Sequence, residues 1–295
     1  MSLIKSYSVG NGDMYYIRHN SDNFSIIDCC IPDDRAANIL PELATQSRDK
    51  HNLRFISTHP DQDHISGLVE LDDLLKLRNF YCVKNAATKP HPTADFDRYV
   101  ELRDSSKAFY LRRGVNRHWM NQSTEVRQTS GIEVLWPIVD DPDHKTVLRD
   151  AAVGRPPNNI SPIIKYRRAH GVSMIWMGDL ETDFMQKLTA KFKLPLIDVL
   201  FAPHHGRASG KVPTAWLAQM NPQLVVIGNA PSEYLDYYRG YNIITQNRAG
   251  DVLFDAQSSK THIYVGDPAY EVDFLDDEGL DHTHGLYYVG SLNSR

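Results

Sequence analysis

The chain has 295 residues, of which 41% are hydrophobic, enough for one large core or two small ones. Its 32 Lys and Arg residues against 37 Asp and Glu residues argue against a protein that coats nucleic acid, although a nuclease needs only a local basic groove. Three cysteines are too few for a disulfide framework, and neither a signal peptide nor an apolar run of ~18 residues is visible, so we expect a cytoplasmic protein without membrane spans.

The first elements expected are short strands separated by turns rich in Gly, Asn and Asp, at about residues 3–9, 14–18 and 24–30. A further strand over 53–58 runs directly into His59-Pro60-Asp61-Gln62-Asp63-His64. Leucines at helical spacing then predict a helix over 68–77. The chain therefore begins with a β-meander, followed by a strand, a loop rich in polar residues and a helix.

The composition changes between about residues 85 and 130, where we predict a helical insertion in a single domain spanning 1–295. A helix is expected over 96–110. Basic residues outnumber acidic ones locally, which is typical of a solvated helix face. The alternative is a surface for nucleic-acid contacts, with Arg112, Arg113 and Arg117 as the candidates.

Regular patterns resume after residue 130. A helix is expected after Asp179 and another over 232–238. Strands are expected over 131–137, 161–168, 172–177, 197–202 and 224–227 and near Val252 and Ile263. Mixed strands first, then alternating strands and helices, predict an α/β sandwich.

Potential metal ligands follow several of these strands. The loop from His59 to His64 holds two His and two Asp residues within six positions, and a loop leaving a strand can turn such neighbours toward one point. Asp179 follows a strand directly, where it could bridge two cations or simply cap a helix. His204 and His205 follow another apolar strand, with Gly206 permitting a tight turn. Together these positions predict a metal site.

The same motifs resemble the metallo-β-lactamase superfamily, and more narrowly the hydrolase domain of ComEC-type competence proteins. The matching segments are Val9-Gly10-Asn11-Gly12-Asp13, His59 to His64, Met177-Gly178-Asp179-Leu180-Glu181 and Pro203-His204-His205-Gly206. The resemblance implies an αββα sandwich of two mixed β-sheets flanked by helices, with metals at one edge. It also implies that Asp28 orients the ligands from behind them.

Carried over position by position, the resemblance assigns one metal to Asp63, His64 and His205, with Asp179 bridging to a second metal on His59 and Asp61. His205 is preferred to His204 as ligand because family members commonly end this motif in His-Gly. The catalytic residues would be Asp63 and His204, the latter donating a hydrogen bond to the developing oxyanion.

Two departures from the family pattern concern one metal. Asp61 replaces a histidine, and Asn158-Asn159 occupies the position of another expected histidine. Oxygen donors move the preference from zinc toward manganese or magnesium, so we expect one or two divalent ions, zinc or manganese, with magnesium as a further candidate.

Metal coordination would lower the pKa of bound water toward ~7 and permit hydrolysis without a covalent enzyme intermediate. The first hypothesis is a phosphodiesterase or nuclease acting on DNA, RNA or a nucleotide. A hydrolase of small molecules such as lactones, thioesters, amides or phosphoesters is the second. The third, suggested by the incomplete first site, is a non-catalytic binding module.

Overall fold

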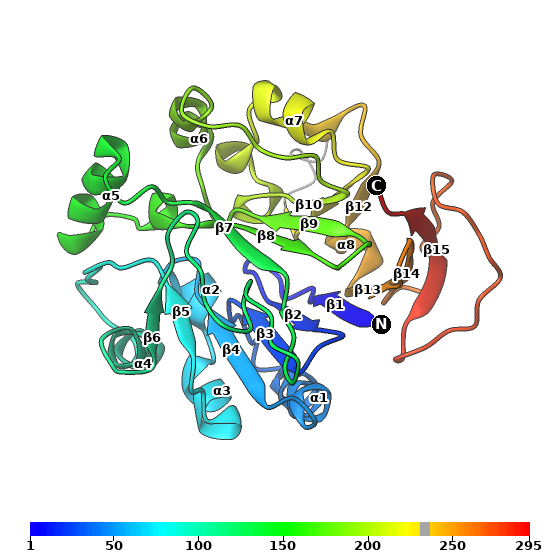
Figure 1. Cartoon of the computed structure of the whole chain (residues 1–295), viewed down its shortest axis with the longest axis horizontal. Helices are drawn as coiled ribbons and strands as arrows, with labels where there is room; N and C mark the ends of the chain where they lie inside the picture. Colours follow the sequence, from blue (N-terminus) through cyan, green and yellow to red (C-terminus); the bar gives the residue numbers. More distant parts are fainter. Residues whose placement is uncertain (231–236) are drawn as a thin grey trace.

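Two β-sheets face each other in the computed structural model, which describes residues 1–230 and 237–295 (Figure 1). The first sheet has nine strands in the order β15-β14-β13-β1-β2-β3-β4-β5-β6. Their bounds are β1 (Ser2–Ser6), β2 (Tyr15–Arg18), β3 (Asn23–Ile27), β4 (Asn52–Ile56), β5 (Phe80–Cys82), β6 (Ala108–Tyr110), β13 (Val252–Ala256), β14 (Lys260–Val265) and β15 (Tyr287–Asn293).

The second sheet has six strands in the order β12-β11-β10-β9-β8-β7. Their bounds are β7 (Ile132–Trp136), β8 (Ile163–Arg167), β9 (Ser173–Trp176), β10 (Val199–Phe201), β11 (Leu224–Ile227) and β12 (Ile243–Thr245). Both sheets are mixed. Strands β3 to β6 and β9 to β12 are parallel, whereas the remaining pairs are antiparallel.

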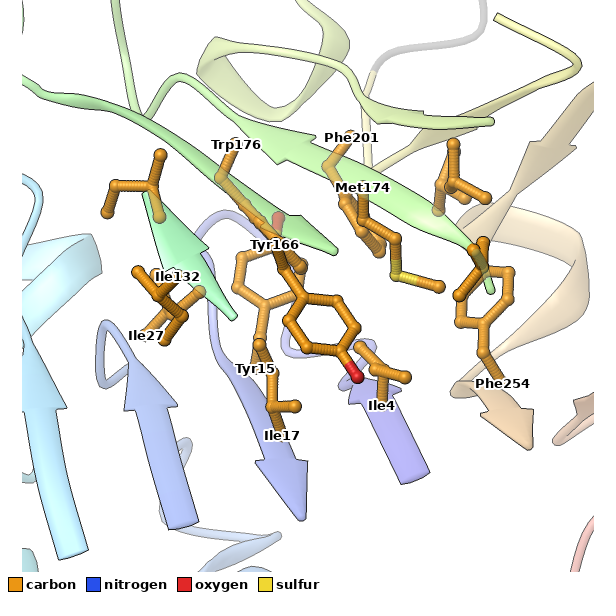
Figure 2. Packing of buried hydrophobic residues seen from close by; sticks show 14 of the residues in the cluster. Ile4, Tyr15, Ile17, Ile27, Ile132, Tyr166, Met174, Trp176, Phe201 and Phe254 are labelled. Atoms are coloured by element: carbon orange, nitrogen blue, oxygen red, sulfur yellow. The ribbon is translucent and has the colours of Figure 1, made fainter. Parts of the chain in front are cut away.

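Apolar side chains from the two sheets interlock between them (Figure 2). The ring of Trp176 on β9 stacks on Phe201 of β10, with centroids 4.7 Å apart, and Tyr15 of β2 meets both rings edge-on. Aromatic pairs in this geometry add to the stabilisation from burial alone. This contact ties the first sheet to the second directly beneath the ends of β9 and β10.

Helices cover the outer faces of both sheets (Figure 1). Helices α1 (Ala36–Ser47), α3 (Leu68–Leu75) and α4 (Ala94–Arg103) pack on the first sheet, and α6 (Thr182–Leu188) and α7 (Thr214–Met220) pack on the second. The remaining helices are α2 (Gln62–Ile65), α5 (Pro142–Ala152), α8 (Gln246–Ala249) and the single turns η1 (Asn158–Ile160), η2 (His204–Gly206) and η3 (Ala208–Gly210). The αββα sandwich predicted from the sequence is therefore confirmed.

The segment predicted as a helical insertion differs from expectation in one element. The helix expected over 96–110 ends at Arg103, and residues Ala108–Tyr110 form β6, which pairs in parallel with β5 at the edge of the first sheet. That part of the helix prediction is wrong because pairing with β5 supplies hydrogen bonds that outweigh local helical preference. The helix expected over 232–238 lies mostly outside the described residues.

Membrane-spanning helices were not expected from the sequence. Among residues 1–230 and 237–295, no helix combines the length and the apolar character needed to cross a membrane.

Candidate metal centre

The candidate site lies where strands of both sheets end. Strands β3 and β4 are parallel and place Ile27 opposite Ile56, so Asp28 and the loop after β4 leave the first sheet at the same edge. Strands β9 and β10 are also parallel, and Asp179 and the His204-His205 pair follow their ends. Register aligns these strand ends within each sheet, and packing of the two sheets brings together side chains more than a hundred positions apart in sequence, such as His64 and Asp179.

Four buried side chains form the centre of this site: Asp13, His64, Asp179 and His205, with one ligand atom from each lying within 4.8 Å of the others. His64 Nε2 lies 3.1 Å from Asp179 Oδ1, and His205 Nε2 lies 3.6 Å from Asp179 Oδ2. Two imidazoles thus face one carboxylate. Imidazole nitrogens and carboxylate oxygens at such spacing are ligands that divalent metals take.

The other residues predicted from the sequence surround this centre. His59 Nε2 lies 3.6 Å from Asp61 Oδ2 and 3.9 Å from Asp179 Oδ2. Asp63 Oδ2 lies 3.3 Å from His205 Nε2. The side chains of Asp61 and Asp63 are each 28% exposed while His59 is fully buried, so the cluster opens to solvent on the side of these two carboxylates.

Asp28 lies behind His64, as the resemblance implied. Its Oδ2 accepts a hydrogen bond from His64 Nδ1 at 2.9 Å, and its Oδ1 accepts one from the Thr58 amide at 2.7 Å. Asp28 adopts a left-handed backbone conformation with φ of 56°. Because Nδ1 donates to Asp28, His64 presents Nε2 to the cluster.

Asp13 is a member of the centre that the sequence analysis did not identify as a site residue. It lies in the connection between β1 and β2, and its Oδ1 is 3.2 Å from His205 Nδ1 and accepts a hydrogen bond from the Tyr15 hydroxyl. Its backbone amide donates to the carbonyl of Asp63. The signal that indicates this residue in the sequence is the segment Val9-Gly10-Asn11-Gly12-Asp13, which ends at Asp13.

The asparagines at the position where the resemblance predicts a histidine support the loop carrying Asp179. Asn159 Nδ2 donates to Glu181 Oε2 at 2.7 Å, and the Glu181 amide donates to Asn159 Oδ1 at 2.9 Å. The neighbouring Ser161 hydroxyl accepts from the Asp179 amide and lies 3.3 Å from His59 Nδ1. These residues therefore hold the two loops that provide Asp179 and His59.

The histidine pair sits in a strained turn. His204, His205 and Gly206 have φ values of 52°, 56° and 85°, all left-handed. At Gly206 a Cβ would lie 2.4 Å from Ile227 Cγ2, so only glycine fits. Strain of this kind persists where the surroundings hold it, and it turns both imidazoles toward Asp179.

Electrostatics in the cluster favour a bound cation. Burial alone lowers the pKa of His64, but the carboxylates of Asp179 and Asp28 raise it well above the usual value. In the same way the pKa of His205 rises to about 10 despite burial, chiefly through Asp13. Burial raises the pKa of Asp63, yet the adjacent imidazoles of His205 and His64 lower it to about 2. Protons on the imidazoles thus balance charge that a metal ion could balance instead.

Buried atoms provide an independent test of whether a metal fits. His59 Nε2, His64 Nε2, His205 Nε2 and Asp179 Oδ1 have no hydrogen-bond partner among the described residues. Leaving such atoms unsatisfied is costly, and coordination would satisfy them together. The donor set of imidazoles and carboxylates fits a divalent cation.

The arginines proposed for nucleic-acid contact have their partners elsewhere. Arg117 lies over the rings of Tyr81 and Phe109 and donates to Asn79. Asn79 precedes β5 and so lies at the amino ends of the parallel strands, whereas the cluster lies at their carboxyl ends. Arg113 lies over Phe192. Arg112 is exposed. Of the three, Arg117 thus has its contacts away from the cluster.

Comparison with family models gives no match, nor does comparison with curated proteins. Among solved structures, the chain is similar to the metallo-β-lactamase fold protein YhfI from Bacillus subtilis, with 10% identity over 82% of this chain and 96% of that one and a TM-score of 0.44. It is also similar to Igni18, a metallo hydrolase from the archaeon Ignicoccus hospitalis, with 13% identity over 86% and 99% of the two chains and a TM-score of 0.48.

Proposed function

We propose that this chain is a divalent-metal-dependent hydrolase of the metallo-β-lactamase fold and that its substrate is a phosphodiester. The observation that carries the proposal is the buried cluster of imidazoles and carboxylates at the ends of β4, β9 and β10, with its unsatisfied ligand atoms. Four motifs that occur in the same order in ComEC-type hydrolase domains support a phosphodiester as the substrate. A cation beside the cluster, Lys89, whose Nζ lies 3.1 Å from Asp61 Oδ1, suits an anionic substrate.

The residues predicted from the sequence as ligands have defined roles under this proposal. His64, Asp179 and His205 would hold a metal, with Asp63 completing its ligands and His59 and Asp61 available to a second ion. A bound metal would lower the pKa of a coordinated water and polarise the attacked phosphate. Zinc, manganese and magnesium are all compatible with these donors.

His204 is placed to stabilise charge on the attacked group. Its Nδ1 lies 3.0 Å from the Ser209 hydroxyl, and its Nε2 points to the cluster, 3.5 Å from Asp179 Oδ2. When the Ser209 hydroxyl donates to Nδ1, Nε2 carries the proton and can donate to a phosphate oxygen. A donor positioned in this way contributes a few kcal/mol to the rate of such reactions.

The test is metal content by elemental analysis, followed by cleavage of bis-p-nitrophenyl phosphate, DNA and RNA with manganese, magnesium or zinc. Metal-dependent cleavage that disappears in Asp179→Asn and persists in Asp183→Asn, an exposed acidic control, would support the proposal. Bound metal without phosphodiester cleavage would instead favour a hydrolase of lactones, thioesters or amides. A protein that binds no metal would favour a non-catalytic binding module.

A further inference from the structure

A groove of about 400 Å³ opens beside the cluster of candidate metal ligands, and Asp61 belongs to both. Its walls are two connections, one between β5 and α4 and one between α5 and η1, which run next to each other below α5 (Figure 1). The Thr88 amide donates to the Ala151 carbonyl at 3.1 Å, and the Thr88 hydroxyl donates to the Ala152 carbonyl. These bonds fix the two walls relative to each other.

The groove presents two cationic side chains, Lys89 and Arg155, on a chain whose net charge is −5. Lys89 lies between groove and cluster, paired with Asp61, with its Nζ 5.5 Å from the centre of the Phe96 ring. Arg155 is 68% exposed and pairs with Asp150 at 2.8 Å. An exposed pair of this kind contributes little to stability, so Arg155 can exchange Asp150 for a phosphate at small cost.

Prolines give the groove apolar and rigid walls. Pro90, Pro156 and Pro157 form walls whose backbone is restricted by their rings. His91 adds an exposed imidazole, a side chain on which a base can stack. Apolar walls with a few charged groups are typical of small-ligand sites, and this volume lies in their range.

We propose that this groove binds the nucleotide adjoining the scissile phosphodiester of a single-stranded nucleic acid, an inference that rests on the proposed function. The base packs against the prolines and His91, and the flanking phosphate is bound by Arg155 and Lys89. Asp61 marks the point at which the groove meets the cluster, so the next phosphodiester along the strand enters the metal site. A groove of this volume accommodates about one nucleotide, and packing of its base against the prolines and His91 requires a base that is not paired in a duplex.

The experiment measures binding of a fluorescein-labelled phosphorothioate thymidine tetranucleotide by anisotropy, with chromatography afterwards to establish that the probe is intact. Arg155→Glu is compared with Arg149→Glu, the same charge reversal on an exposed arginine of α5 outside the groove. We expect Arg155→Glu to weaken binding by about tenfold and to reduce the slope of log affinity against log salt by about 0.7. The control should change affinity by less than a factor of two.

Equal affinities of the two variants, no binding by the wild type, or equally strong competition by blunt duplex DNA would overturn the proposal. Cleavage assays separate this result from failure of the proposed function. If Arg155→Glu weakens binding but the wild type cleaves no phosphodiester with any metal, nucleotide binding in the groove is supported and the proposed reaction is contradicted. If the wild type cleaves and Arg155→Glu leaves KM for the tetranucleotide unchanged, the proposed reaction is supported and nucleotide binding in the groove is contradicted.

Discussion

Asp28 Oδ2 lies 2.9 Å from His64 Nδ1, so that the opposite nitrogen of the imidazole faces Asp179 at 3.1 Å. Both carboxylates are buried, and they come from different sheets, Asp28 after β3 and Asp179 after β9. His64 thereby connects the two halves of the sandwich at the edge where the site forms. The orientation of this ring depends on a residue that does not itself face the cluster.

Replacing Asp28 with Asn should weaken metal binding by roughly 10- to 100-fold, because the amide no longer fixes the tautomer of His64. Asn tolerates the left-handed φ of 56° at this position, which keeps the backbone in place. Metal affinity would be measured by competition with a chelating dye. Asp33→Asn, which removes one exposed carboxylate, is the matched control. Equal affinities in both variants would contradict the role of Asp28.

Substitutions of the two adjacent histidines should have different effects. His205→Ala or His205→Asn removes a ligand, so metal content should fall, whereas His204→Asn should keep its metal and lose rate by roughly 100-fold. Asn is suited to both positions because each has a positive φ. Elemental analysis together with turnover of bis-p-nitrophenyl phosphate distinguishes them. The opposite pattern would exchange the roles of the two residues.

Asp95 should stabilise the loop that carries Asp63 and His64. Its carboxylate accepts from the amides of Gly67 and Val69 at the start of α3 and from the Gln62 side chain. Loss of such a cap costs about 1–2 kcal/mol. Urea unfolding of Asp95→Ala should show this loss in the free energy of unfolding.

The control for this prediction is Asp97→Ala. Asp97 is an exposed acidic residue in the same first turn of α4, so both variants lose the same favourable interaction with the helix dipole. A difference of less than about 0.5 kcal/mol between the two would show that the hydrogen bonds of Asp95 add nothing.

Stability should fall in mild acid partly through His144. This buried side chain packs edge-on against Trp136, and burial lowers its pKa to about 4. In the unfolded chain the histidine has a pKa near ~6.5 and binds a proton that the folded protein excludes. The contribution of His144 is therefore complete above pH 6.5 and is lost as pH falls from about 6.5 to about 4, at up to ~1.4 kcal/mol per pH unit.

The measurement is the free energy of unfolding of wild type and His144→Phe at several pH values. Phe keeps an aromatic ring against Trp136 but cannot be protonated, so the wild type should lose stability relative to the variant as the solution becomes acidic. Other titrating groups are common to both proteins and cancel in the difference. Parallel curves between pH 4 and pH 7 would refute the prediction.

Much of the fold and the site could be predicted from sequence because the signals are local. Alternating apolar residues predicted the strands that became β3, β4, β9 and β10. The dense His59 to His64 loop, together with Asp179 and the His204-His205 pair at later strand ends, indicated a metal site. The four motifs, taken in order, then implied the αββα architecture because they resemble those of a known family. Strand periodicity and ligand chemistry are both determined by residues a few positions apart, so a single sequence contains them.

Pairing and register decided the rest. Residues Ala108–Tyr110 became β6 because β5 offered an edge with matching hydrogen bonds, which no local pattern reveals. Asp13 joined the centre because β1 and β3 run in the same direction, so the connection after β1 lies at the same end of the first sheet as Asp28. Convergence of distant side chains depends on which strands are neighbours and how they align. The sequence by itself determined the elements and the chemistry available at their ends, while the tertiary structure alone decided which of those ends meet.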